Sequence, residues 1–342
     1  MRFKSATWCV TDSAENHTVR KTDFIRAAAV VILAIAAGAC CAQNFPSRPV
    51  RFVLSYGAPG GTPDIIARML GAKLTDKWGR QVVIDPRPGG GGIMAAEIVA
   101  SAAADGYTIF LVSPSHLING ALHARLSYDP LKSFAAVTQV ADVPNILSIH
   151  PSVAARSVRE LIALAKAKPG SLAYGSAGTG SSQHLSGELF KKMAGVELVH
   201  VPYKVATAAV IDLIAGRIQI AFASNSSLPH IRAGRLAGLA VTSARRSSAL
   251  PDLPTIAESG VPGYEASGWY GVLVPARTPG AIVAKLHDDI AQVLREPEIR
   301  TQLAANTIEV AVSATPGDFT AFLVKESAKW SVLVKESGAR VD

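Results

Sequence analysis

Along residues 43–342, short apolar runs alternate with segments in which apolar residues recur at helical spacing. This alternation predicts strands followed by helices. Residues 50–55 (VRFVLS) and 108–113 (TIFLVS) are short, almost continuous apolar runs, typical of strands in a sheet that is covered on both faces. Residues 64–76 instead place apolar side chains at helical spacing, directly after a glycine- and proline-rich turn. A strand at 81–85 and a helix at 93–103 complete a first β/α unit.

A second alternation follows further along the chain. We predict strands at 137–140, 145–150, 172–176, 198–203, 218–223 and 236–242, with helices at 158–168, 181–194 and 207–215. A strand at 268–274 would return to the first unit, and helices at 279–294 and 316–337 would end the chain. The pattern predicts an α/β protein with two lobes, each a mostly parallel sheet flanked by helices. Residues 43–142 with 267–342 form lobe 1 and residues 143–266 form lobe 2, so two chain crossings would place a ligand cleft at the hinge.

Residues 1–42 have the composition of a secretory signal peptide. Arg20, Lys21 and Arg26 precede an apolar stretch, 27–39, that ends in small residues, and we predict cleavage after Ala42. An apolar run of about 13 residues is shorter than the roughly 20 that span a bilayer, so we expect a soluble mature chain in the periplasm. Acylation of Cys40, as in a lipoprotein, is an alternative, although no leucine precedes it at the expected spacing.

Removing this segment changes the charge and cysteine content. Five of the 34 Lys and Arg residues and three of the 26 Asp and Glu residues lie in residues 1–42, which leaves 29 against 23 and a net charge of +6. All three cysteines are removed as well, so we expect stability to come from core burial rather than from disulfides. The remaining basic residues are dispersed, which argues against a nucleic-acid partner. We expect a monomer without a cofactor.

The first candidate site is the turn at residues 55–64, between a predicted strand and a predicted helix. Gly60 and Gly61 allow backbone N–H groups to point into one concavity, and the helix N-terminus adds partial positive charge, so the turn suits a carboxylate or phosphate. Tyr56 lies in the same turn, and Asp64 would either cap the helix or hold a ligand amine. A purely structural role of this turn is the alternative. The turn 87–93 (RPGGGGI) is similar in kind.

The second candidate site is the turn at residues 174–184, again between a strand and a helix. Its candidate groups for a second anionic end are Ser176, Gly178, Thr179, Gly180, Ser181 and His184. No Lys follows Gly180 as in a P-loop, and no G-x-S-x-G motif frames the serines. Ser181 and His184 would be a nucleophile and base in a secreted hydrolase, but residues at this spacing at a helix start more often serve in capping.

The histidines, the aromatic pair at 269–270 and Asn225 are the remaining candidate functional residues. The eight histidines show no metal-ligand spacing, so we expect no metal site. Trp269 and Tyr270, at the predicted return crossing, would either wall the cleft or belong to the core. Asn225 follows a predicted strand and lies in a polar turn at the strand end where such sheets bind ligands.

Long segments of the chain resemble one known family. They include PGGTPDIIAR, PRPGGGG, ADGYTIFLV, LSYDPLKSFAAVT, SLAYGSAGTGSSQHLSGELFKKMAGVELVHVPYK, LPTIAESGVPGYEASGWYGVLVPA and the terminal KWSVLVKESGA. These segments are similar to those of the periplasmic solute receptors of the tripartite tricarboxylate transporters, the Bug family. The resemblance covers essentially the whole mature length.

The resemblance implies a periplasmic binding protein of type II, with the Venus-flytrap fold, that closes on a small carboxylate and delivers it to a membrane permease. It implies binding through main-chain amides and bridging waters rather than through an arginine clamp. It also implies that the turn with Gly60, Gly61 and Asp64 opposes the turn 176–181. By the same resemblance, Ser113, Tyr203 and Asn225 line the gap.

Two departures from the family leave the ligand open. Val205 follows Tyr203 and Lys204, where the family usually has Gly, and Asn225 stands where Asp is common. A dicarboxylate, a hydroxy or amino acid, and an aromatic carboxylate all remain candidates. The receptor role needs no catalytic group, so we expect no enzyme. The alternatives are a ligand sensor for a two-component system and a hydrolase using Ser181 and His184.

Overall fold

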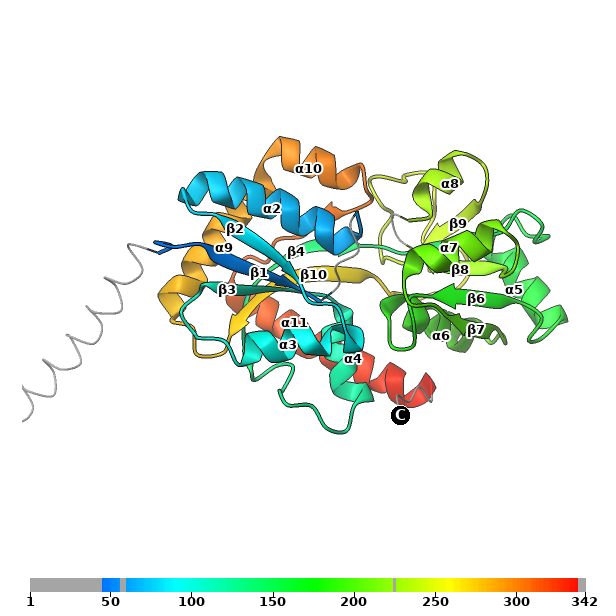
Figure 1. Cartoon of the computed structure of the whole chain (residues 1–342). Helices are drawn as coiled ribbons and strands as arrows, with labels where there is room; N and C mark the ends of the chain where they lie inside the picture. The colour runs from blue at the N-terminus through cyan, green and yellow to red at the C-terminus, as the bar shows by residue number, and fades with distance from the viewer. Residues whose placement is uncertain (1–44, 56–59, 224–225, 338–342) are drawn as a thin grey trace, which may run out of the picture. The chain divides into compact units, whose positions relative to one another are not determined.

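The computed structural model of this 342-residue chain describes residues 45–55, 60–223 and 226–337. The predicted signal peptide, Tyr56 and Asn225 lie outside the described residues. The described strands form two sheets, each flanked by helices, so the fold class is α/β as predicted (Figure 1).

The first sheet has six strands in the order β11-β4-β10-β3-β1-β2. Their bounds are β1 Val50–Leu54, β2 Val82–Pro86, β3 Thr108–Val112, β4 Phe134–Val143, β10 Gly268–Pro275 and β11 Glu309–Val310. Strand β1 pairs in parallel with β2 and β3, whereas β10 pairs antiparallel with both β3 and β4. Strands β1 to β4 therefore share one direction, and the returning strand β10 is inserted between them in the opposite direction.

The second sheet has five strands in the order β7-β6-β8-β5-β9. Their bounds are β5 Ile146–Ile149, β6 Ala173–Ser176, β7 Val199–Pro202, β8 Ile220–Ala223 and β9 Ala237–Val241. Strand β6 is parallel to β7 and β8, and β5 is antiparallel to its two neighbours. In each sheet the strand that enters from the other sheet, β10 or β5, therefore runs against the majority.

The helices cover both faces of both sheets. Their bounds are α2 Thr62–Trp78, α3 Ile93–Ala100, α4 Pro114–Leu122, α5 Val158–Ala167, α6 Ser182–Ala194, α7 Ala206–Ile214, α8 Leu228–Arg232, α9 Gly280–Arg295, α10 Pro297–Ala304 and α11 Pro316–Ser337, with a short 3₁₀ turn at Gly90–Gly92. In Figure 1, α2, α9 and α10 lie on one side of the first sheet, and α3, α4 and α11 lie on the other.

Alternation along the strands fills two cores on the first sheet. Phe52 and Leu54 of β1 pack in the cluster with α2, α9 and α10, whereas Val53 packs in the cluster with α3, α4 and α11. All three side chains are fully buried, because successive side chains of a strand point to opposite faces and both faces are covered. The continuous apolar runs in the sequence have this cause.

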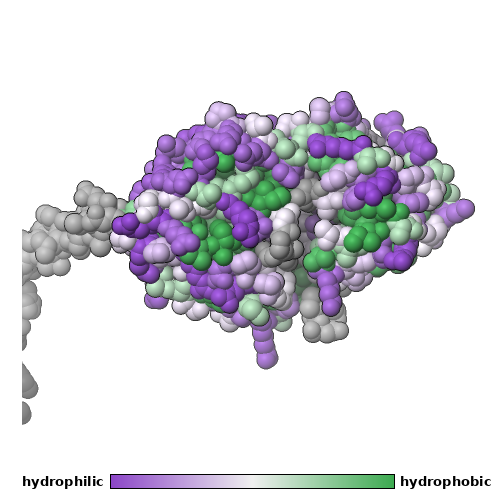
Figure 2. All heavy atoms as spheres, turned by 45° about the horizontal axis from the view of Figure 1, so that its top comes forward, coloured by the Kyte–Doolittle hydropathy of each residue, from purple (hydrophilic) through white to green (hydrophobic). Residues whose placement is uncertain are grey.

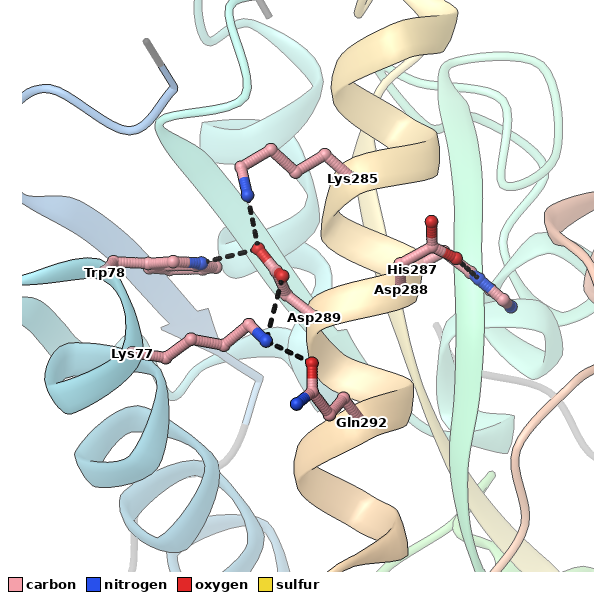
Figure 3. A network of polar contacts seen from close by, with 7 residues as sticks. All are labelled: Lys77, Trp78, Lys285, His287, Asp288, Asp289 and Gln292. Carbon is pink, nitrogen blue, oxygen red and sulfur yellow. Dashed lines mark hydrogen bonds and ion pairs between the residues drawn. The ribbon is translucent and has the colours of Figure 1, made fainter. Parts of the chain in front are cut away.

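A polar network fixes α2 against α9 (Figure 3). The carboxylate of Asp289, on α9, accepts from Trp78 Nε1 at 2.7 Å and from Lys285 Nζ at 2.9 Å through its Oδ2. Lys77 Nζ lies 3.3 Å from Asp289 Oδ1 and also donates to Gln292 Oε1. The carboxylate is mostly buried and fully hydrogen-bonded, so it anchors the C-terminal end of α2.

The chain passes between the sheets twice. Strand β4 leads through Pro144 and Asn145 into β5, and the segment after β9 leads through Ser267 into β10. At the first crossing, the Asn145 N–H donates to Thr242 Oγ1 at 2.9 Å, which ties the two passages together. The division of the chain into two lobes at these crossings stays a prediction.

Several elements differ from the predicted ones. Helix α4 follows β3 in a segment for which no element was predicted, and α8, α10 and β11 were also missed. The α4 sequence, PSHLINGAL, has few strong helix formers, and contacts with other segments hold it: His116 Nε2 bonds to Pro130 O at 2.9 Å and Asn119 Nδ2 donates to Gly91 O at 3.0 Å. Helix α4 brings new residues to the site described below.

The surface of the described part has a mixed character. On the face that Figure 2 shows, hydrophilic residues are spread widely and the apolar patches between them are separate. Among the helices of the described ranges, none combines the length and the apolar composition that a membrane crossing requires.

Candidate ligand-binding site

A cavity of about 180 Å³ lies where strands of both sheets end. Its walls are formed by residues that follow the C-terminal ends of β1, β3, β6, β7 and β8, and by residues of both chain crossings. The crossings and the neighbouring turns contribute Val143, Asn145, Ala177, Lys204, Ser226, Gly268, Trp269 and Tyr270. The site is therefore built by segments from residue 61 to residue 270, which only the fold brings together.

The rest of the lining comes from the first residues of four helices. The N-cap residues are Gly61 of α2, Ser113 of α4, Ser181 of α6 and Val205 of α7, and all four line the cavity. The following residues of each helix complete it: Thr62 and Pro63, Pro114 and Ser115, Ser182 and Gln183, and Ala206 and Thr207. The first N–H groups of a helix have no partner within the helix, and a helix N-terminus carries about half a positive charge. Pro63 in α2 and Pro114 in α4 supply no N–H of their own. Four helix N-termini around one cavity make it attractive to an anion.

The four helix starts differ in how they are capped. Ser181 Oγ accepts from the His184 N–H at 3.2 Å, so α6 has a side-chain cap. The N-cap side chains of α2, α4 and α7 accept no hydrogen bond from a backbone N–H of their helix, and Ser113 Oγ instead pairs with Ser115 Oγ at 3.3 Å. The N–H groups at these three helix starts are therefore not taken up by an N-cap side chain.

Asp64 lies in the first turn of α2 and is 5% exposed. Its Oδ2 accepts from the Gly60 N–H at 3.1 Å and its Oδ1 accepts from Arg68 Nε at 2.8 Å. Burial opposes ionisation, but the hydrogen bonds from Arg68 and Gly60 outweigh it and hold the pKa of Asp64 below its usual range. Asp64 was predicted to cap the helix or to hold a ligand amine. Its contacts resemble capping, because the carboxylate accepts from the N–H of the residue before the N-cap Gly61 and already has a second partner in Arg68.

The turn 176–181 uses most of its polar groups internally. The Gly178 N–H donates to Ser176 Oγ at 3.1 Å, the Gly180 N–H donates to His184 Nδ1 at 3.2 Å, and Ser181 Oγ donates to Gly178 O at 2.7 Å. Gly178 and Gly180 adopt φ values of 108° and 80°, which a side chain would strain. The turn is thereby shaped so that Ala177 and the start of α6 face the cavity.

The rings of His184 and His200 lie against each other next to this turn, with an angle of 31° between their planes. Their ring centroids are 4.1 Å apart, and His200 Nε2 lies 2.7 Å from Ser176 Oγ. Burial lowers the pKa of His184, and burial together with the neighbouring His184 lowers the pKa of His200 to about 4. Both rings are therefore neutral at pH 7.

The contacts of Ser181 and His184 match capping rather than nucleophilic catalysis. The serine hydroxyl bonds to the backbone N–H of His184, while the ring accepts from Gly180. Within the described ranges, no hydrogen bond joins the hydroxyl to the imidazole. A serine nucleophile needs its base within hydrogen-bond reach.

The predicted site residues divide into two groups in the structure. Gly61, Ser113 and Ser181 line the cavity. Behind them or outside the lining lie Gly60, Asp64, Ser176, Gly178, Thr179, Gly180, His184 and Tyr203. The Tyr203 hydroxyl donates to Asp212 Oδ2 at 2.8 Å, and burial with this bond raises the pKa of Tyr203 to about 12. Tyr56 and Asn225 lie outside the described residues.

The lining residues missed by the sequence analysis share a recognisable signal. Six are the two residues directly after a predicted site residue, at the first turn of a helix: Thr62, Pro63, Pro114, Ser115, Ser182 and Gln183. Ala206 and Thr207 hold the same place in α7 but follow Val205, which was not predicted. Trp269, which was left open between cleft wall and core, is 2% exposed and also lines the cavity. Among the described lining residues Lys204 is the one that carries a charge.

Metal chemistry finds no support in the described part of the chain. No group of three or more His, Cys, Asp or Glu side chains there is arranged to hold a metal ion.

The fold and the cavity define an α/β solute-binding protein, and solved structures agree with this class. The adipate-bound Rpa4515 protein of R. palustris is 39% identical, with a TM-score of 0.80, over 87% of this chain and 100% of that chain. The periplasmic binding protein BugD is 30% identical, with a TM-score of 0.77, over 86% of this chain and 99% of that one. MatC of Rhodopseudomonas palustris, with bound malate, is 28% identical over 85% and 100% of the two chains, with a TM-score of 0.75.

Sequence comparison gives the family. Residues 66–339 match the tripartite tricarboxylate transporter family receptor. Protein BugT of Bordetella pertussis is 35% identical over 88% of this chain and 92% of its own length. A protein of the UPF0065 group from Pseudomonas sp. strain P51 is 36% identical over 91% and 94% of the two chains. The chain belongs to the tripartite tricarboxylate transporter receptor family.

Proposed function

We propose that this protein captures a small carboxylate between its two lobes in the periplasm and delivers it to a membrane permease of the tripartite tricarboxylate type. The observation that carries this proposal is the convergence of four helix N-termini on one cavity. The partial positive charge and the backbone N–H groups of helix starts favour carboxylates without an arginine. The adipate and malate bound to two similar proteins are acids of this kind.

The charges around the cavity support an anion and not a cation. The described lining includes Lys204 and no acidic side chain, and Asp64 is held by Arg68 behind it. A ligand ammonium group would need a carboxylate or several carbonyl acceptors to replace its water. Amino acids are therefore weaker candidates than acids without an amine.

We propose that the lobes are residues 43–142 with 267–342, and residues 143–266. Each lobe supplies two of the four helix starts, α2 and α4 from the first and α6 and α7 from the second. A carboxylate that bridges these helix starts would stabilise the closed arrangement of the lobes, because its binding free energy depends on both. A permease could recognise this closed form on a monomer.

Export through the predicted signal peptide is part of the same proposal. BugD is a periplasmic binding protein, and a receptor for a membrane permease must reach the compartment in which the ligand arrives. Uptake of a radiolabelled ligand by cells with and without the permease would separate a transport role from signalling through a two-component system.

A ligand panel tests the proposed function directly. We expect the mature protein to show a higher melting temperature with at least one of adipate, malate, nicotinate and citrate, because a ligand at 100 times its dissociation constant stabilises the folded state by about 2.7 kcal/mol. Differential scanning fluorimetry would find the ligand and calorimetry would confirm it. Glucose is the uncharged control: stabilisation by glucose with none by any acid would contradict an anion site.

A further inference from the structure

Val205 is unusual in two respects, as an N-cap residue and as an exposed apolar residue. It is the N-cap of α7, with φ −146° and ψ 151°, yet valine is among the poorest N-cap residues because its side chain accepts no hydrogen bond. The residue is also 44% exposed although it is apolar. It lies in the lining of the cavity. Local departures of this kind are expected where a residue serves binding rather than stability.

The valine leaves the start of α7 available to a ligand. A Ser, Thr, Asn or Asp at this position would accept from the N–H of the second or third residue of the helix. Ser181 does this for α6, where its Oγ accepts from the His184 N–H. At α7 the corresponding Ala208 N–H reaches only the Val205 carbonyl oxygen, at 3.2 Å. An apolar N-cap thus keeps the partial positive charge of α7 directed at the cavity.

The lining of the cavity contains further apolar residues besides Val205. Pro63, Val143 and Ala177 are part of the same lining, and so is Trp269. The indole N–H of Trp269 already donates to Glu326 Oε2 at 2.9 Å, so this side chain has no donor left for a ligand. The cavity therefore combines carbon surface with the helix start that attracts a carboxylate.

We infer that Val205 is a specificity-determining residue, which selects acids with an apolar chain next to the carboxylate over hydroxy acids. This inference rests on the proposed function. A methylene against the isopropyl group loses water without losing a hydrogen bond, whereas a hydroxyl there loses water and finds no partner on the valine. Differences of one methylene or hydroxyl in an apolar pocket change affinity roughly tenfold or more.

The test compares adipate and malate on the wild type and on V205T and V205G, by isothermal titration calorimetry on the mature protein. We expect the wild type to bind adipate more tightly than malate. Threonine has the shape of valine but carries a hydroxyl that can cap α7, so V205T should lower adipate affinity roughly tenfold and reduce the ratio of adipate to malate affinity. V205G should reduce the ratio as well, and V205I should retain it.

Thermal unfolding without ligand distinguishes selection from a structural role. The new cap in V205T should raise the melting temperature of the unliganded protein while adipate affinity falls. V332T is the matched control: Val332, on α11, is 55% exposed and is not part of the lining, so V332T should leave the ratio unchanged.

The outcomes separate this inference from the proposed function. A wild type that prefers malate, or a ratio that stays constant in V205T and V205G, would overturn the role of Val205 while the carboxylate receptor stands. If the wild type binds none of the acids of the panel, the proposed function is wrong and the inference falls with it.

Discussion

At the scale of a single residue, the surroundings of Asp142 near the end of strand β4 change the pKa of its carboxyl group. Asp142 lies on β4, two residues before Pro144 at the first chain crossing, and its Oδ1 accepts from Gln139 Nε2 at 2.6 Å. Burial and the nearby Glu309 carboxylate raise the pKa of Asp142 to about 6. The folded state thus holds this proton more tightly than the unfolded chain. The resulting stability is present at low pH and is lost as the pH rises through 6.

Replacing Asp142 by Asn should therefore stabilise the protein at neutral pH. We expect D142N to raise the free energy of unfolding by about 1 kcal/mol at pH 7.5, less than the full shift in pKa would give, since the carboxyl is partly exposed. Near pH 4 the gain should vanish, because the wild-type carboxyl is then protonated. Urea unfolding at both pH values measures this, with D76N at an exposed position of α2 as the control. An equal gain at both pH values would contradict the assignment.

At the scale of an element, the start of a helix determines which N–H groups reach the cavity. Ser182 is the first residue of α6 and lines the cavity, and the N-cap Ser181 has φ −72° and ψ 158°. This extended conformation is the one that a residue before proline prefers, and proline itself is well tolerated at the first helical position. The chain already carries Pro114 as the first residue of α4. One N–H can therefore be removed from α6 without breaking the helix.

We expect S182P to fold normally and to bind the identified carboxylate roughly tenfold more weakly, because a hydrogen bond to a charged group is worth about 1.5–3 kcal/mol. Circular dichroism would check the fold and calorimetry the affinity. G280P is the matched control, since Gly280 is the first residue of α9 and lies outside the cavity lining. Equal affinities of S182P and the wild type would place the ligand away from the start of α6.

At the scale of the whole described molecule, helix α6 joins the two sheets as well as lining the cavity. Leu185 of α6 is fully buried and packs in the core cluster of the first sheet, together with Leu117 of α4 and Trp330 of α11. The Ser248 N–H donates to Glu309 Oε1 at 2.8 Å and forms another link between the parts that carry the two sheets. Contacts of this kind would set the balance between open and closed lobes.

We expect L185A to lower the free energy of unfolding by about 2–5 kcal/mol and also to weaken ligand binding, although Leu185 does not line the cavity. The second effect is expected under the proposed closure of the lobes, because truncating Leu185 removes packing between α6 and the core of the first sheet. L161A is the control: Leu161 of α5 is equally buried, but within the core of the second sheet. It should destabilise without changing affinity. Equal losses of affinity in L185A and L161A would argue against coupling between this contact and closure.

The sequence by itself determined the local structure and the family. The continuous apolar runs placed β1 and β3, and the helical spacing placed α2 and α6, close to their observed bounds. The turns before the helices pointed to Gly61 and Ser181, which line the cavity. These features depend on neighbours within a few residues, which periodicity and turn chemistry describe directly. The long similar segments likewise identified the receptor family, which the comparisons confirmed.

Only the tertiary structure determined which of the candidate residues line the same cavity. Ser176 and Gly178 were natural candidates, but their hydroxyl and N–H groups bond within their own turn, whereas Ser113 and Val205, 92 positions apart, line the same cavity. Helix α4, weak in helix formers, exists because Pro130 and Gly91 hold its side chains. The physical reason is that the site is made by strand ends of two sheets. Pairing and packing between distant segments arrange these ends, and no local pattern records them.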